Sequence, residues 1–178
     1  MYEDLELIRD DTLRLLNNTQ DVAERQTMQE FEKLRRGTRN ELSLREREEC
    51  WHADAKVSAQ FAYMRRLVRT EGFVSHVMGD FTELDLNKSG RLDIKELEDY
   101  LRNREMAGKG SKILFSNAKV PPQSAKSFLS DLDIDGDGQV SRPEWLMYVA
   151  YLHWQRYVTE YETIERTRPE KPGPCHCQ

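Results

Sequence analysis

Cysteine is scarce in this sequence, with three residues in 178. Cys50 stands alone, whereas Cys175 and Cys177 flank His176 in the last stretch, RPEKPGPCHCQ. This distribution gives no indication of a disulfide framework. A metal site in the Cys-His-Cys stretch would lack a second cysteine pair, so we expect a proline-rich tail there instead.

Long apolar runs and basic clusters are also missing. Charged residues make up 33% of the chain and the formal net charge is −5, so we expect a soluble, cytoplasmic protein without a membrane span. The start, MYEDLELIRDD, is acidic where a secretory or mitochondrial presequence is basic. No basic stripe predicts nucleic-acid binding. No nucleophile elbow, phosphate loop or metalloprotease motif occurs, so we expect no enzyme.

Two segments of twelve residues share one pattern of acidic residues and glycines. They are DLNKSGRLDIKE from Asp85 and DIDGDGQVSRPE from Asp133. A loop that encloses Ca²⁺ must supply about six to eight oxygen ligands and a glycine at its sharp turn. Gly90 and Gly138 occupy the turn position. The oxygen donors at the ligand positions are Asp85, Asn87, Ser89, the Arg91 carbonyl, Asp93 and Glu96, and then Asp133, Asp135, Asp137, the Gln139 carbonyl, Ser141 and Glu144.

The sequence around both loops resembles the EF-hand superfamily of calmodulin-like calcium-binding proteins, over residues 71–155. Ser89 departs from the Asp or Asn of the family pattern. Apolar residues recur at helical spacing around the loops: Phe73, Val77, Phe81, Leu84, Leu97, Leu101, Ala125, Leu129, Leu132, Trp145, Val149 and Leu152. Each closing glutamate also has the spacing of a helix-capping partner, with Asp93 and with Ser141.

The resemblance implies an all-α fold built on paired helix–loop–helix units. It implies two Ca²⁺ sites, at loops 85–96 and 133–144, with Mg²⁺ as an alternative ion, and a short β-bridge between Leu92 and Val140. It also implies that Ca²⁺ reorients the helices and exposes an apolar face. That face would comprise Phe73, Phe81, Leu101, Leu129, Trp145 and Val149.

The two loops differ in charge. Lys88, Arg91 and Lys95 bring the first loop to a net charge of zero, whereas the second loop has four acidic ligands against Arg142. Calcium affinity in this motif depends on the number of charged ligands. We therefore predict that the second loop is the tighter site.

Residues 1–70 are expected to form a charged helical extension. Asn17–Thr19 are predicted to break a first helix, Gly37 to end a second, and Thr38 with Glu41 to open a third that reaches about Arg69. An apolar seam runs along this third helix through Val57, Phe61, Met64 and Val68. The seam predicts either a coiled-coil or docking helix, or a helix that folds back over the EF-hand pair.

Residues 156–178 are expected to extend the last helix and to end in the proline-rich tail. Trp154, Tyr157, Tyr161 and Ile164 form a stripe that favours either a partner interface or an intramolecular core. Between the loops, the glycine-containing stretch from Met106 to Pro122 predicts a flexible connection.

These features predict a non-enzymatic, calcium-responsive or calcium-stabilised subunit or adaptor of a larger assembly. Its partners would bind the N-terminal helices, the C-terminal aromatic helix and the EF-hand groove. The alternatives are a structural subunit of a ciliary or flagellar, microtubule-associated complex whose Ca²⁺ or Mg²⁺ does not switch, a soluble calcium buffer, and a regulatory subunit of an enzyme. The ciliary and cytoskeletal location depends on family analogy.

Overall fold

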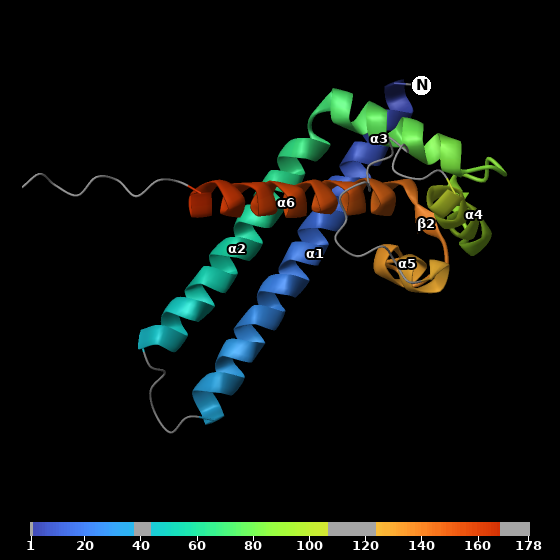
Figure 1. The fold of residues 1–178 in the computed structure, drawn as a ribbon. Helices are drawn as coiled ribbons and strands as arrows, with labels where there is room; N and C mark the ends of the chain where they lie inside the picture. Colours follow the sequence, from blue (N-terminus) through green and yellow to red (C-terminus); the bar gives the residue numbers. More distant parts are fainter. Residues whose placement is uncertain (1, 38–43, 107–123, 168–178) are drawn as a thin grey trace, which may run out of the picture.

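The computed structural model describes residues 2–37, 44–106 and 124–167 (Figure 1). The predictions for Thr38 with Glu41, for the stretch after Met106 and for the tail from 168 lie outside these residues. The described ranges confirm the all-α class, with six helices and one short two-stranded sheet. In chain order these are α1 (Tyr2–Gly37), α2 (Leu44–Val68), α3 (Glu71–Leu84), β1 (Arg91–Leu92), α4 (Ile94–Met106), α5 (Ala125–Leu132), β2 (Val140–Ser141) and α6 (Arg142–Thr167).

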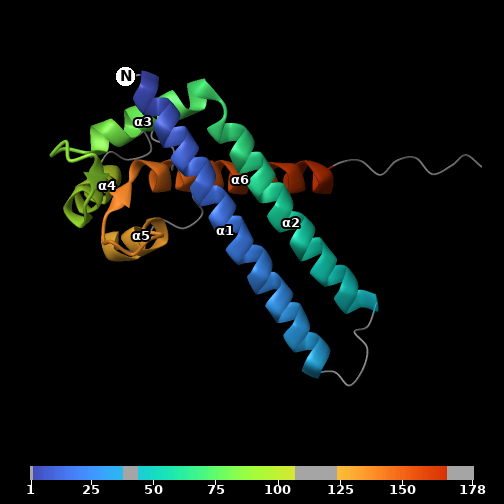
Figure 2. The same cartoon turned by 180° about the vertical axis from the view of Figure 1, so that it is seen from behind.

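The long helices α1 and α2 lie side by side as an antiparallel hairpin (Figures 1 and 2). α1 is continuous through Asn17–Thr19, so the predicted break is wrong. Thr19 Oγ1 donates to the Leu15 carbonyl at 2.8 Å within the helix. The side-chain oxygens of Asn17 and Gln20 accept hydrogen bonds from Arg65 Nη1 on α2. These polar side chains therefore form hydrogen bonds within α1 and between α1 and α2, and they do not end a helix.

The apolar seam of α2 is packed inside the fold. Phe61, Met64 and Val68 are buried, and α2 packs against both α1 and α6. α1 contributes Ile8, Thr12 and Leu16 to the buried set. Of the two interpretations of the seam, the structure supports the helix that folds back.

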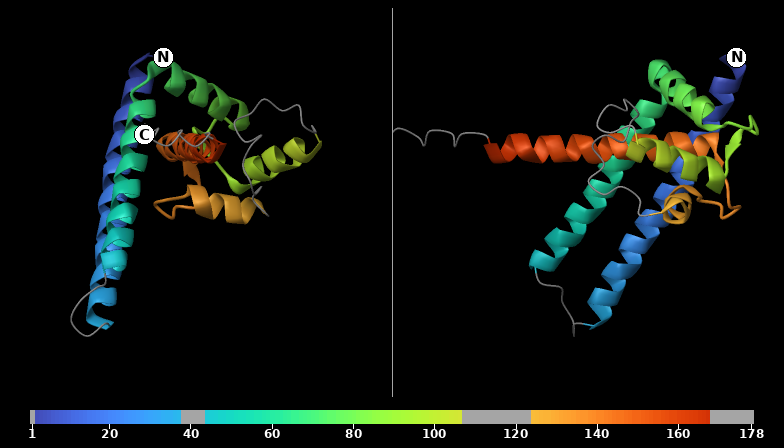
Figure 3. Two further views of the ribbon diagram at one scale, coloured as in Figure 1. Left: turned by 60° about the vertical axis from the view of Figure 1, so that its left-hand side comes forward. Right: turned by 45° about the vertical axis from the view of Figure 1, so that its right-hand side comes forward.

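Helix α6 occupies the centre of the molecule. It crosses the α1–α2 hairpin (Figure 1), and α4 and α5 lie on its opposite side (Figure 3). Its first turns are closely packed, and Trp145, Leu146, Val149 and Ala150 are all fully buried. The Trp145 ring meets Phe81 of α3 edge-on, with the ring centroids 6.4 Å apart. Helix α6 thus forms part of the second helix–loop–helix unit and also packs against the α1–α2 hairpin.

Candidate metal centre

Each twelve-residue loop joins two helices, as predicted. The first lies between α3 and α4 and the second between α5 and α6. β1 and β2 pair antiparallel and place Leu92 opposite Val140 and Arg91 opposite Ser141. The Leu92 and Val140 side chains are fully buried. The predicted β-bridge is therefore confirmed, and it fixes the two loops against each other.

The turn glycines have the backbone conformation that the loops require. Gly90 and Gly138 have φ values of 80° and 83°. An L-residue with a Cβ rarely adopts these angles, whereas glycine does so without strain. Both loops can therefore bend sharply between their first and last donors.

The second loop gathers three carboxylates. Asp133, Asp135 and Asp137 each offer an oxygen, and these oxygens lie within 4.8 Å of one another. Gly138 N–H donates to Asp133 Oδ2 at 2.8 Å, and Gly136 N–H donates to Asp133 Oδ1 at 2.7 Å. These backbone hydrogen bonds, that of Gly138 first, lower the pKa of Asp133. They therefore favour its charged form, which is the form that binds a cation.

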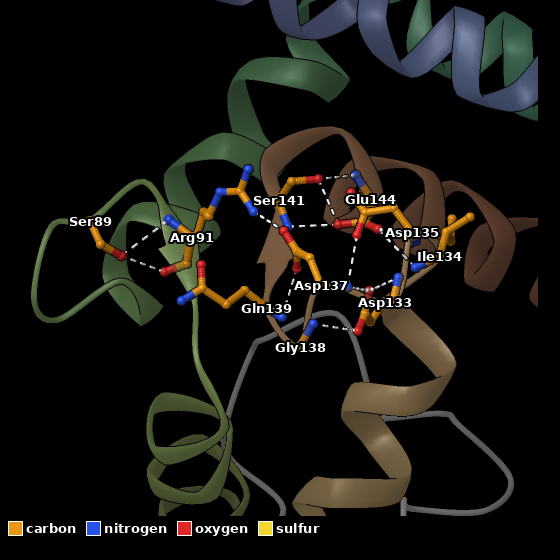
Figure 4. Close-up of polar contacts among 11 residues, drawn as sticks. Ser89, Arg91, Asp133, Ile134, Asp135, Asp137, Gly138, Gln139, Ser141 and Glu144 are labelled. Atoms are coloured by element: carbon orange, nitrogen blue, oxygen red, sulfur yellow. Dashed lines mark hydrogen bonds and ion pairs between the residues drawn. The ribbon is translucent and has the colours of Figure 1, made fainter.

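Glu144 closes this loop from a buried position, with an exposed fraction of 3%. Its Oε1 accepts the N–H of Ile134 at 2.8 Å, and its Oε2 accepts the N–H of Ser141 at 2.8 Å (Figure 4). The Ser141 hydroxyl donates to the same Oε2 at 2.6 Å. The closing carboxylate is thus anchored to both ends of the loop.

The first loop repeats this framework. Asp85 and Glu96 are buried. Asp85 Oδ2 accepts the Gly90 N–H at 2.8 Å, and Glu96 Oε1 accepts the Asn87 N–H at 3.1 Å. Asp93 N–H donates to Glu96 Oε2 at 3.0 Å, while Glu96 N–H donates to Asp93 Oδ1 at 3.0 Å. The predicted reciprocal capping pair is therefore present at the start of α4.

Neutral donors distinguish the first loop from the second. Asn87 and Ser89 stand where the second loop has Asp135 and Asp137. The Ser89 hydroxyl donates to the Arg91 carbonyl at 2.8 Å, so two predicted donors interact directly (Figure 4). The second loop therefore concentrates more negative charge.

The donor chemistry of both loops fits a hard divalent cation. Every predicted ligand is an oxygen, from carboxylates, an amide, hydroxyls and backbone carbonyls, and Ca²⁺ and Mg²⁺ prefer such donors. In the second loop Asp133, Asp135, Asp137 and Glu144 would hold the ion, with the carbonyl of Gln139. The individual ligand assignments and the number of ions stay predictions.

One contact was missed by sequence reasoning. The Arg91 guanidinium, from the first loop, pairs through Nη1 with Asp137 Oδ2 of the second loop (Figure 4). The motif treats Arg91 as a carbonyl donor alone. The pairing register of the β-bridge, which places Arg91 opposite Ser141, was the signal that could have indicated this contact.

Comparison with known proteins identifies the class. Residues 75–149 match the family model of the EF-hand domain pair. Residues 75–149 therefore form an EF-hand domain pair, a family of calcium binders that are typically not enzymes. Neither a curated protein nor a solved structure matched the chain. Among the described helices, none combines the length and apolar character needed to cross a membrane.

Proposed function

We propose that this EF-hand protein binds Ca²⁺ at both loops and acts as a calcium-responsive or calcium-stabilised subunit or adaptor of a larger assembly. The observation that carries the proposal is the sharing of α6. This helix begins with Glu144 of the second loop in its first turn and also packs against the α1–α2 hairpin. Ion binding at the second loop is thereby connected to α1 and α2. These helices have 36 and 25 residues, and a simple calcium buffer would not need them.

Exposed apolar side chains support a partner surface. On α1, Val22 and Met28 have exposed fractions of 45% and 61%, and on α6, Tyr157 and Tyr161 have 47% and 54%. Aromatic residues and methionine are enriched in protein interfaces. We propose that the hairpin and the distal part of α6 contact protein partners, together with the EF-hand groove, in a cytoplasmic location that includes the cytoskeleton or cilium.

The aromatic stripe is partly used within the chain. The Tyr63 ring of α2 lies 5.1 Å from that of Tyr157 and 5.5 Å from that of Trp154. Tyr161 continues the stripe 6.3 Å beyond Tyr157. The stripe therefore combines an intramolecular contact with an exposed continuation that is open to a partner.

The face that calcium binding is expected to expose is largely buried in the fold. Phe81, Trp145 and Val149 are fully buried, whereas Phe73, Leu101 and Leu129 are partly buried. Exposing this face requires α3 and α6 to separate. Binding of an ion to the folded form without such a change would stabilise the fold by mass action.

A calcium titration in millimolar magnesium tests the proposal. The full chain would carry Trp51→Phe and Trp154→Phe, so that the fluorescence reports Trp145 beside Glu144, and a hydrophobic dye would be present. We expect a saturable transition that Glu144→Gln weakens. Dye uptake would indicate a sensor that opens, and a transition without dye uptake would indicate a structural ion. Absence of any transition would contradict calcium binding.

The assembly role needs a separate test. Val22→Lys with Met28→Lys places two charges on the exposed surface of α1, and Ser130→Lys, exposed on α5, is the matched control. In an extract from cells that express each tagged variant, we expect the control to co-migrate with a large complex and the double variant to elute as free protein. Elution of all forms at the size of the free chain would favour the calcium buffer.

A further inference from the structure

We propose that Arg91 acts as a built-in competitor of the metal ion in the second loop and so sets the calcium affinity of that loop. The inference depends on the proposed calcium binding and assigns a regulating residue to the same site. Its basis is the ion pair between Arg91 of the first loop and Asp137 of the second.

Arg91 is connected to both loops at once. Its backbone carbonyl is the predicted donor of the first loop and accepts the Ser89 hydroxyl at 2.8 Å. Its guanidinium reaches across the β-bridge to Asp137 Oδ2 (Figure 4). The antiparallel pairing of β1 with β2 holds the residue in this position.

Asp137 is also part of the acidic cluster. Its Oδ1 accepts the Gln139 N–H at 2.9 Å, and its carboxylate lies with those of Asp133 and Asp135. The guanidinium therefore places a positive charge beside the three carboxylates. This charge relieves the mutual repulsion of the three carboxylates when no ion is bound. It also opposes the entry of a metal cation.

Two effects of Arg91 act in opposite directions. By orienting Asp137 the ion pair would assist metal binding, and the 47% and 34% exposure of the two side chains lets solvent screen this effect and the repulsion alike. The repulsion between the guanidinium and a divalent ion is twice that between two single charges at the same distance. Repulsion therefore prevails, and Arg91 lowers the affinity of the second loop.

The test compares Arg91→Gln with Lys95→Gln in the full chain. Both variants remove one positive charge from the first loop, but Lys95 lies at the start of α4, where its N–H donates to Asp93. Calcium binding to the second loop would be followed by Trp145 fluorescence in the Trp51→Phe, Trp154→Phe background and by calorimetry. We expect Arg91→Gln to raise the affinity about three- to tenfold and Lys95→Gln by less than about twofold.

Ionic strength and a double-mutant cycle give independent readouts. Salt screens an exposed pair, so the gain in affinity from Arg91→Gln should shrink as potassium chloride is raised. In an Asp137→Asn background, which keeps an oxygen donor, Arg91→Gln should have no more effect than Lys95→Gln.

Three outcomes would overturn the inference. Equal gains from Arg91→Gln and Lys95→Gln would show that total loop charge alone matters. A loss of affinity in Arg91→Gln, with an unchanged circular dichroism spectrum, would show that the arginine organises the loop. If the unsubstituted chain showed no calcium transition, the proposed function would be refuted as well. This outcome distinguishes failure of the proposed function from failure of the inference about Arg91 alone.

Discussion

At the scale of single residues, the glutamates that close the two loops are predicted to be central to ion binding. Glu144 and Glu96 are both buried and both bind the N–H groups of their own loops. Each side chain can give an ion two oxygens from one carboxylate. The environments of the two glutamates are alike. A difference in calcium affinity between variants of the two glutamates would therefore reflect the other ligands of each loop.

Glu144→Gln should therefore cost more calcium affinity than Glu96→Gln. The second loop has the carboxylates of Asp135 and Asp137 where the first has Asn87 and Ser89, so it contributes more of the total binding free energy. We expect a loss of about tenfold or more for Glu144→Gln in a calorimetric titration. Equal losses in the two variants would contradict the charge argument.

The acidic cluster should reduce stability when no ion is bound. Asp135→Asn removes one of three close negative charges and keeps a side-chain oxygen that can accept the Asp137 N–H. We expect its melting temperature to rise without calcium, because repulsion falls, and its calcium affinity to drop about tenfold. Calorimetric melting with chelator and with calcium would show both effects, and a lower melting temperature in chelator would refute the first.

The sequence was informative about these residues because the motif fixes each by its position in the loop. The β-bridge followed from the resemblance to the EF-hand family, and the turn glycines and the capping pairs follow from spacing within a few residues. The contact between Arg91 and Asp137 does not, because it joins residues 46 positions apart. Such a contact depends on how two loops face each other in space.

At the scale of elements, α1 shows how tertiary contacts override local signals. Asparagine and threonine are common at helix ends because their side chains can bind free backbone groups. In α1, Asn17 and Gln20 instead accept hydrogen bonds from Arg65 of α2. The partner that makes a continuous helix favourable lies about 45 residues away, so no local pattern could indicate it.

The packing of α1 gives a direct test of the hairpin. Leu16 is fully buried and Leu7 is 63% exposed on the same helix. We expect Leu16→Ala to lower the free energy of unfolding by about 2–5 kcal/mol, because it removes a packed side chain and leaves a cavity. Leu7→Ala is the control and should change it by less than about 0.5 kcal/mol. Urea unfolding measures both, and similar losses would mean that α1 is not packed as described.

At the scale of the whole molecule, His153 couples stability to pH. It lies on α6, and its ring meets that of Phe73 on α3 edge-on, at 5.3 Å between centroids. Burial, followed by the positive charges of Arg156 and His76, lowers the pKa of His153 below its ordinary value of 6.5. The unfolded chain therefore binds a proton at a higher pH than the folded chain does.

The stabilising contribution of neutral His153 should be complete above about pH 6.5 and should be lost as the pH falls below that value. His153→Gln should accordingly show a smaller drop in melting temperature between about pH 7.5 and pH 5.5. Lys126→Gln, at an exposed position on α5, is the control. If the unsubstituted chain and His153→Gln lost stability equally, His153 would not be the group responsible.

The continuity of α6 has a mechanical consequence. From Glu144 to Thr167 the helix spans 24 residues, whose 23 steps of about 1.5 Å make a rod about 35 Å long. Because the second loop holds one end of this rod, a tilt there would be multiplied along its length. A rotation of about 10° at Glu144 would displace the far end by about 6 Å, if the helix moves as one body. Any tilt of the shared helix at Glu144 would therefore become a larger displacement at its distant end.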